Sequence, residues 1–293
     1  MNSRYKDAGV DDDAAHDMLS SLGLSSHHFG SGFATPSGDS ACVSVESAGT
    51  KAILLTERNR FEDLGWDAAA MAINDIVVRG AQCSLLLDHL MMEKISHAAR
   101  EIILGVDSAA VFCGAALIGG ETAQLPGLMK QGAHYVSVTA IGFAEQLLNH
   151  NSAMPGDLLV GIESSGLHSN GFSLIRQMKK IPDSFLERTR IYRPEEIEDA
   201  RCAAHITGGG LPTKVATLVP EGACAVIEKG SWTVPGVFDE VRQGLDLDEE
   251  EMWSVFNMGI GLVYAINPED LKTDAMVIGR IEESEASANF RFI

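Results

Sequence analysis

The sequence has few cysteines and no long apolar run. Its five cysteines are odd in number, and no two of them form a Cys-x-x-Cys pair. We therefore expect neither a disulfide framework nor a thiolate zinc site, and we interpret the cysteines as buried, reduced side chains. No stretch approaches the ~18 consecutive apolar residues of a membrane span. The first residues also lack the basic-then-apolar pattern of a secretory signal, which predicts a cytoplasmic protein.

Basic side chains are scarce as well. The chain has 22 Lys and Arg against 41 Asp and Glu, which gives a formal charge of −19. Sequence-independent binding to nucleic acid depends on neutralising phosphates with Lys and Arg, so we expect neither a nucleic-acid nor a membrane partner. Hydrophobic residues make up 45% of the 293 residues, an ordinary globular share that predicts a substantial core.

Strand and helix patterns alternate along the chain and predict the α/β (α+β) fold class, with two mixed domains over 1–150 and 151–293. The first forty residues, rich in Gly, Ser, Asp and His, predict a mobile glycine-rich segment. Pro155 and Gly156 indicate the linker between the domains. The predicted strands are 41–46, 51–56, 134–143, 157–163, 223–228 and 260–266, and the predicted helices are 63–80, 93–116, 170–180 and 235–244.

Three carboxylates lie in a buried helix or at the ends of predicted strands, where α/β proteins often bind metal ions or phosphates. Asp75 lies in an otherwise apolar helix, in which Asp67 and Asn74 are seven residues apart and share a face. Glu121 follows Gly119-Gly120 at the end of a predicted strand, and Glu46 ends another. Hard oxygen donors from separate elements suit magnesium that also holds substrate phosphates. A salt bridge or a capping role stays open as the alternative for each.

Two glycine loops each precede a predicted helix, and the first of them also follows a predicted strand. They are Ser164–Gly171, which contains His168, and His205–Gly210. Free backbone N–H groups at a helix start attract phosphate, and a histidine can transfer a proton near neutral pH. A solvated loop histidine is the alternative. The string Ser47-Ala48-Gly49-Thr50-Lys51 lacks the Gly-Lys-Ser/Thr order of a P-loop, so the pattern indicates another kind of phosphate-handling fold.

Five short strings occur together and in order: Tyr5–Asp11, Gly119–Ala123, Ser164–Ser173, His205–Gly210 and Phe256–Gly259. With them the chain, from its N-terminus to about residue 266, resembles the aminoimidazole ribonucleotide synthetases, also called phosphoribosylformylglycinamidine cyclo-ligases. It is similar more broadly to selenophosphate synthetase and thiamine-monophosphate kinase. The segment between Arg176 and His205 and the tail after residue 266 are shorter than in those relatives, so we expect a compact, divergent member.

The resemblance implies a homodimer in which each N-terminal domain contributes strands to a barrel at the interface, with ATP in the cleft between domains. The implied reaction belongs to de novo purine biosynthesis. ATP phosphorylates the formyl amide oxygen of formylglycinamidine ribonucleotide, and ring closure gives aminoimidazole ribonucleotide, ADP and phosphate. Two alternatives stay open: a related ATP-dependent small-molecule kinase or synthetase of the same fold, and a catalytically silent homologue that acts as a binding subunit.

The resemblance also implies roles for individual residues. His168, Glu121 and Asp75 would be catalytic, with His168 transferring a proton. Glu46 stands where the family usually has Asp, and Glu46, Asp75 and Glu121 would bind Mg²⁺. The residues expected to bind ATP are Lys6, Asp7, Gly30, Gly32, Lys51 and Asn74. The residues expected to bind the substrate are Ser169, Asn170, Thr207, Gly208 and Gly209.

Overall fold

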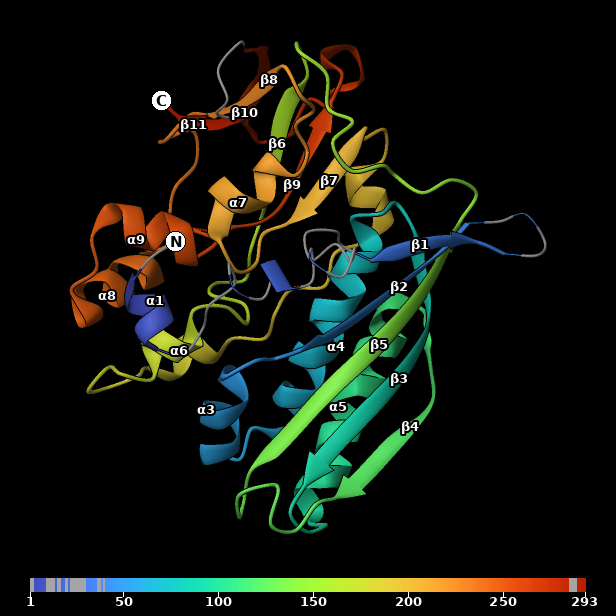
Figure 1. Cartoon of the computed structure of the whole chain (residues 1–293), viewed down its shortest axis with the longest axis vertical. Helices are drawn as coiled ribbons and strands as arrows, with labels where there is room; N and C mark the ends of the chain where they lie inside the picture. The colour runs from blue at the N-terminus through green and yellow to red at the C-terminus, as the bar shows by residue number, and fades with distance from the viewer. Residues whose placement is uncertain are drawn as a thin grey trace. The chain divides into compact units, whose positions relative to one another are not determined.

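A computed structural model describes residues 3–8, 14, 17–18, 21, 30–35, 38, 40–284 and 289–293. These residues form two compact units, each with one sheet (Figure 1). The N-terminal unit comprises 30–147 and 182–196, and the C-terminal unit comprises 148–181, 197–293 and the described residues of 1–29. Most of the segment predicted to be mobile, including Gly9, Val10 and Asp11 of the first family string, lies outside the described residues.

The N-terminal unit contains a five-stranded sheet in the order β1-β2-β5-β3-β4. Its strands are β1 (Ser31–Ala34), β2 (Ser40–Ser47), β3 (Gln82–Met92), β4 (Ala116–Gln124) and β5 (His134–Ala144). Neighbouring strands are antiparallel except β3 and β4, which are parallel. Helices α4 (Phe61–Val77) and α5 (His97–Cys113) cover one face of this sheet (Figure 1). Helix α3 (Lys51–Glu57) precedes α4.

The two long helices lie unusually close together. A Cβ atom on Gly65 of α4 would collide with the Ile102 carbonyl of α5, and one on Gly105 would collide with the Glu62 carbonyl. The small side chains of α4, among them Ala68 and Ala72, are fully buried. Glycine and alanine therefore allow backbone-to-backbone packing of α4 on α5 beneath the sheet.

The C-terminal unit contains a six-stranded sheet in the order β11-β8-β10-β6-β9-β7. The strands are β6 (Leu158–Glu163), β7 (Cys202–His205), β8 (Ala223–Ile227), β9 (Ile260–Ile266), β10 (Val277–Glu283) and β11 (Phe290–Phe292). The helices are α1 (Ser3–Asp7), α6 (Phe172–Ile175), α7 (Gly210–Ala216), α8 (Gly236–Leu245) and α9 (Glu249–Val255). A short 3₁₀ turn occurs here at Pro268–Asp270, whereas the 3₁₀ turns at Asp183–Leu186 and Pro194–Ile197 belong wholly or mostly to residues 182–196 of the N-terminal unit. Every residue of β9 is buried, so this strand lies in the core of the unit.

The structure confirms most predicted elements and corrects two. The predicted strand at 51–56 is wrong, because these residues form α3. Its buried positions, Lys51, Ala52, Leu54 and Leu55, are spaced at one, three and four residues, as on one side of a helix. The predicted helix at 170–180 is reduced to α6, after which turns with hydrogen bonds from residue i to i−3 continue the chain. Among the described residues, no helix is long and apolar enough to cross a membrane.

Candidate functional site

The polar face of α4 binds a distant segment of the chain, residues 182–196, which we call the strap. The Thr189 amide donates to Asp67 Oδ1 at 2.7 Å. Asn74 Nδ2 donates to the Arg190 carbonyl at 2.9 Å, and the Tyr192 amide donates to Asn74 Oδ1 at 3.0 Å. Asp67 and Asn74 therefore share a face, as their spacing indicates, and that face places the strap in the N-terminal unit rather than in a continuous domain 151–293.

A buried ion pair lies at the start of this polar face. Lys51 Nζ is 2.6 Å from Asp67 Oδ2, and both side chains are 0% exposed. Nζ also donates to the Glu187 carbonyl of the strap at 2.7 Å. Burial lowers the pKa of Lys51 and raises the pKa of Asp67, while the contact between the two charges opposes both changes. In this structure the Lys51 ammonium group thus holds the strap and is enclosed by protein.

The predicted magnesium ligands lie on two faces of one sheet. Asp75 of α4 is buried and accepts a hydrogen bond from Ser44 Oγ at 3.0 Å. Glu46 is opposite Val138, and Val138 is opposite Asp88, so the side chains of this row lie on the face covered by the helices. Glu121 is opposite His89, one position further along, and therefore lies on the other face, where it is exposed.

Because side chains alternate between the two faces of a strand, one copy of the chain does not bring Glu46, Asp75 and Glu121 together. Among the residues that the structure describes, no group of three or more His, Cys, Asp or Glu side chains is placed to hold a metal ion. Glu46 and Asp75 have the hard oxygen donors that a magnesium ion requires. Glu121 does not join them within one protomer, so the donor set in a single copy is incomplete.

Asp88 is an acidic residue of this region that the sequence patterns did not single out. It is buried in the middle of β3, and its Oδ2 atom has no hydrogen-bond partner among the described residues. Burial raises the pKa of this carboxyl group. Gly120 on β4 leaves no room for a Cβ atom beside the Asp88 carboxylate. A single Asp in the apolar run 85–92 was the signal that could have identified it.

The described part of the glycine segment lies against the end of α4. Arg79 Nη1 donates to the Gly30 carbonyl at 2.9 Å. Gly30 has φ +48°, and a Cβ atom there would lie 3.3 Å from the Asp75 carbonyl oxygen, so glycine suits the position. Gly32 is exposed on β1. Lys6 and Asp7 are exposed on α1, in the C-terminal unit.

A buried histidine lies in the first glycine loop of the C-terminal unit. His168 is 1% exposed, has φ +55°, and its Nε2 accepts a hydrogen bond from the Ser165 amide at 3.2 Å. A ring nitrogen that accepts is deprotonated, so the imidazole is neutral with its proton on Nδ1. The loop is held by Asn257, whose Nδ2 donates to the Gly166 carbonyl at 2.9 Å and whose Oδ1 accepts from the Gly259 amide at 2.9 Å.

Phe256 brings the two glycine loops of the C-terminal unit together. A Cβ atom on Gly171 would collide with the Phe256 ring, and one on Gly210 would lie 3.1 Å from the Phe256 carbonyl oxygen. The strand–loop–helix order predicted for the first loop is confirmed by β6 and α6. The helix predicted after the second loop is α7, and the structure adds strand β7 before that loop. The predicted substrate residues Ser169, Asn170, Thr207, Gly208 and Gly209 therefore lie in loops on either side of one residue. The Asn170 Nδ2 atom is buried without a hydrogen-bond partner among the described residues.

Comparison with known proteins gives the class of this molecule. Residues 30–144 match the AIR synthase related protein, N-terminal domain, and residues 154–288 match the corresponding C-terminal domain. The fold is similar to that of thiamine monophosphate kinase from Aquifex aeolicus, with a TM-score of 0.68 and 16% identity over 94% of this chain and 97% of that one. It is also similar to hydrogenase maturation protein HypE in complex with ATP (TM-score 0.63, 17% identity, 78% and 76% covered). The chain thus has the two-domain fold of the AIR synthase-related proteins.

More similar sequences narrow the class to one family. The cyclo-ligase of Geobacillus kaustophilus is 38% identical over 250 residues, which cover 77% of this chain and 72% of that protein. The cyclo-ligase of Shouchella clausii is 33% identical and is aligned over 98% of both chains. The chain belongs to the phosphoribosylformylglycinamidine cyclo-ligase family. The second alignment spans 341 positions against 293 residues here, so this chain lacks segments that the relative has.

Proposed function

We propose that this chain is an ATP-dependent ligase that closes formylglycinamidine ribonucleotide to aminoimidazole ribonucleotide, releasing ADP and phosphate in purine biosynthesis. The observation that carries the proposal is identity of 33–38% to cyclo-ligases over 77–98% of the chain. A fold relative described in complex with ATP supports the choice of nucleotide. The free, largely buried cysteines are in keeping with a reducing cytoplasm.

The proposed chemistry has two steps. The γ-phosphoryl group of ATP passes to the formyl amide oxygen, and the neighbouring amidine nitrogen then attacks that carbon and expels phosphate. Phosphoryl transfer requires mainly positioning and electrostatic stabilisation. We place the substrate phosphate at the glycine loops around Phe256, with Ser169 and Asn170 on one side and Thr207, Gly208 and Gly209 on the other. His168 is the proposed proton-transfer group.

Magnesium, when bound, would neutralise phosphate charge in this reaction. We assign Glu46, Asp75 and Glu121 as its ligands. Glu121 lies on the opposite face of the sheet from Glu46, so the three carboxylates do not meet within one protomer in this structure. Asp88 lies in the same row as Glu46 and would add negative charge near this site.

Some of the proposed ATP-binding residues would contact the nucleotide, and others would position the elements around it. Lys6 and Asp7 are exposed and are proposed to contact the nucleotide directly, and Gly30 lies beside the Asp75 backbone. Lys51 and Asn74 already bind the strap backbone. We therefore propose that these two residues act on the nucleotide by positioning the strap and α4.

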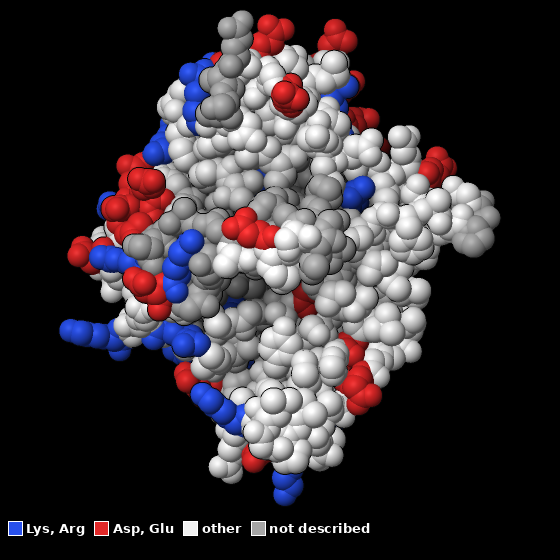
Figure 2. All heavy atoms as spheres, in the orientation of Figure 1, with Lys and Arg blue, Asp and Glu red and all other residues white. Residues whose placement is uncertain are grey.

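A homodimer is the assembly that the exposed face of the N-terminal sheet favours. Phe33, Val45, Tyr135 and Phe143 lie on the face that the helices leave uncovered, and 53%, 61%, 39% and 40% of these residues, respectively, are exposed. The surface over strands β3 to β5 in Figure 2 is mostly uncharged. Exposed apolar side chains gathered on one face of a sheet are typical of an interface. We propose that two copies pair these sheets into the interface barrel, with ATP in the cleft of each protomer.

The test is a coupled assay of ADP release with formylglycinamidine ribonucleotide, ATP and magnesium. We expect turnover with this substrate and none when thiamine monophosphate replaces it. No ADP release by the folded protein, under conditions where another cyclo-ligase is active, would exclude the proposed reaction. ADP release with thiamine monophosphate alone would support the kinase alternative. Absence of release with either acceptor would support a catalytically silent subunit.

The first prediction concerns Glu121. Glu121→Gln removes the carboxylate charge without changing shape, so we expect kcat to fall by about 10²-fold or more, with unchanged far-UV circular dichroism. Glu57→Gln, an exposed glutamate at the end of α3, is the matched control and should retain wild-type kcat. Wild-type activity of Glu121→Gln would show that Glu121 is not a ligand. If Glu46 is a ligand, Glu46→Asp should shift the magnesium concentration needed for half-maximal rate.

A further inference from the structure

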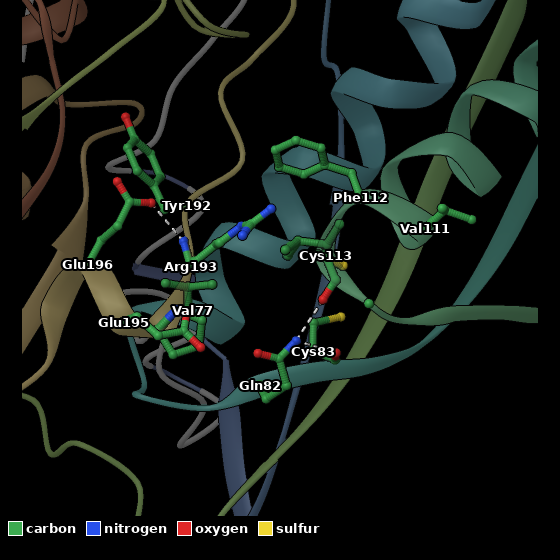
Figure 3. A pocket seen from close by; sticks show the side chains of 13 residues that line it. Val77, Gln82, Cys83, Val111, Phe112, Cys113, Tyr192, Arg193, Glu195 and Glu196 are labelled. Atoms are coloured by element: carbon green, nitrogen blue, oxygen red, sulfur yellow. Dashed lines mark hydrogen bonds between the residues drawn. The ribbon is translucent and has the colours of Figure 1, made fainter.

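Two cysteines line one cavity of the N-terminal unit, away from the carboxylates and glycine loops discussed above. The cavity has a volume of about 510 Å³ and is formed by the ends of α4 and α5, the start of β3 and the strap (Figure 3). Cys83 of β3 and Cys113, the last residue of α5, lie next to each other on its wall, with Phe112 and Arg193 beside them. Both thiols are free.

Contacts between the end of α5 and the start of β3 fix the positions of the two thiols. Cys113 Sγ donates to the Ala110 carbonyl at 3.3 Å, and the Cys83 side chain lies beside it (Figure 3). Gln82 Nε2 donates to the Cys113 carbonyl at 2.7 Å, which ties the end of α5 to the start of β3 (Figure 3). Cys113 is partly exposed to the cavity, whereas Cys83 is 1% exposed. An outer thiol with an inner partner is the arrangement of an attacking and a resolving cysteine.

The charges around the pair distinguish the two thiols. The neighbouring Cys83 side chain lowers the pKa of Cys113, with the Arg193 charge assisting and burial opposing. The neighbouring Cys113 side chain and burial raise the pKa of Cys83. Burial raises the pKa of Cys42 and of Cys202 to about 11. Only a thiolate is a strong nucleophile, so Cys113 is the reactive member of the pair. Arg190 is paired with Glu196, and Glu195 also lines the cavity, so the positive charge nearest the thiols is Arg193.

We propose that Cys83 and Cys113 form a redox-active dithiol, which a small hydroperoxide entering this cavity converts to an intramolecular disulfide. The Cys113 thiolate attacks one peroxide oxygen, the O–O bond breaks, and the leaving alkoxide or hydroxide takes up the proton that Cys113 had released. Cys113 is then a sulfenic acid. The Cys83 sulfur attacks the Cys113 sulfur, the S–O bond breaks, and the hydroxide leaves with the Cys83 proton as water. Two electrons pass from the thiols to the peroxide, and a dithiol reductant reverses the reaction.

The experiment treats the full-length protein with a few equivalents of hydrogen peroxide at pH 7 and then alkylates it under denaturing conditions. We expect a mass decrease of about 2 Da before alkylation, two of the five thiols to escape alkylation, and recovery of both thiols with dithiothreitol. Peptide mapping should find the Cys83–Cys113 linkage. Retention of all five thiols, or a different linkage, would overturn the proposal.

Single cysteine variants distinguish formation of the Cys83–Cys113 disulfide from unspecific oxidation of thiols. Cys83→Ser should leave Cys113 as a sulfenic acid that a dimedone probe captures, without a disulfide. Cys113→Ser should protect Cys83 and reduce the rate of peroxide consumption about tenfold or more. Cys202→Ser, a buried thiol of the C-terminal unit, is the matched control and should form the disulfide like the wild type. Equal oxidation in Cys113→Ser and wild type would contradict the assignment. The readout is thiol chemistry, so it is independent of ligase activity.

Discussion

Lys51 and Asp67 illustrate how a charged pair is used for structure inside the N-terminal unit. Each side chain is fully buried, and each also makes a hydrogen bond to the strap backbone, through Glu187 and Thr189. A buried charge is tolerated when an opposite charge and further hydrogen bonds satisfy it. The pair therefore joins α3, α4 and the strap at one point.

Removal of one partner should be strongly destabilising. In Asp67→Ala the Lys51 ammonium group stays buried without its carboxylate, and we expect the free energy of unfolding to fall by about 3–5 kcal/mol. Urea denaturation followed by fluorescence measures this change. Asp239→Ala breaks an exposed pair with Arg242 at 3.7 Å and should change stability by less than about 0.5 kcal/mol. Similar shifts in the two variants would show that the buried pair is not a stabilising contact.

At the scale of elements, α4 serves two sets of contacts at once. Its apolar positions pack on α5 and on strands β2 and β5, while Asp67 and Asn74 hold the strap. The strap has no strand partner, so its backbone groups depend on these side chains. We therefore expect the strap to be less protected from hydrogen exchange and proteolysis when one of these polar contacts is removed.

Asn74→Ala tests this dependence. The variant leaves the Arg190 carbonyl and the Tyr192 amide without their partners, so we expect a loss of about 1–3 kcal/mol in stability. Hydrogen exchange at the Tyr192 amide should accelerate by about tenfold or more, and proteolysis within 182–196 should increase. Gln131→Ala, an exposed amide side chain in a turn, is the control and should leave both measurements unchanged. Unchanged exchange at Tyr192 in Asn74→Ala would contradict the role given to Asn74.

His134 at the start of β5 links stability to pH. Its ring lies edge-on to Phe61 of α4 at 5.3 Å, and burial, followed by the nearby His97, lowers its pKa below 6.5. As pH falls below about 6.5 the unfolded chain takes up a proton before the folded chain does, so this contribution to stability decreases. The unfolding temperature should fall from pH 7 to 5.5 in the wild type and fall less in His134→Gln. Parallel curves for the two proteins would exclude His134 as the group responsible.

At the scale of the whole molecule, charge and apolar surface are distributed unevenly. A formal charge of −19 repels polyanions from the molecule as a whole. Both proposed substrates are nevertheless polyanions. Backbone amides of the glycine loops and a bound cation would reverse the field locally. The exposed sheet face of the N-terminal unit has a different composition, with apolar side chains in place of charged ones. Self-association through that face is the proposal that most affects Glu121, because Glu121 lies on the same face.

Val45→Glu places a charge on this face, where 61% of Val45 is exposed. We expect the variant to sediment as a monomer under conditions where the wild type is a dimer, and to lose ligase activity in parallel, since Glu121 lies on the same sheet face. Val111→Glu is the control, because Val111 is 70% exposed but lies on α5, away from the sheet face. A wild-type protein that sediments as a monomer would contradict the proposed homodimer.

Local patterns determined much of this molecule. The helical period of 63–80 indicated α4, and the seven-residue spacing of Asp67 and Asn74 placed both on one face. The alternation in 134–143 indicated β5, and the short motifs identified the family. These features depend on residues close together in the chain, where geometry is set by the repeat of a helix or strand. The strand predicted at 51–56 was wrong because a short apolar run suits either element.

Only the tertiary structure decided how distant residues combine. The face on which Glu121 lies depends on the register of β4 with β3, and the position of the strap depends on contacts that span more than one hundred residues. The neighbouring thiols come from a strand and from the end of a helix thirty residues apart. Such placements result from long-range pairing and from packing around a shared core, neither of which is written in the local pattern.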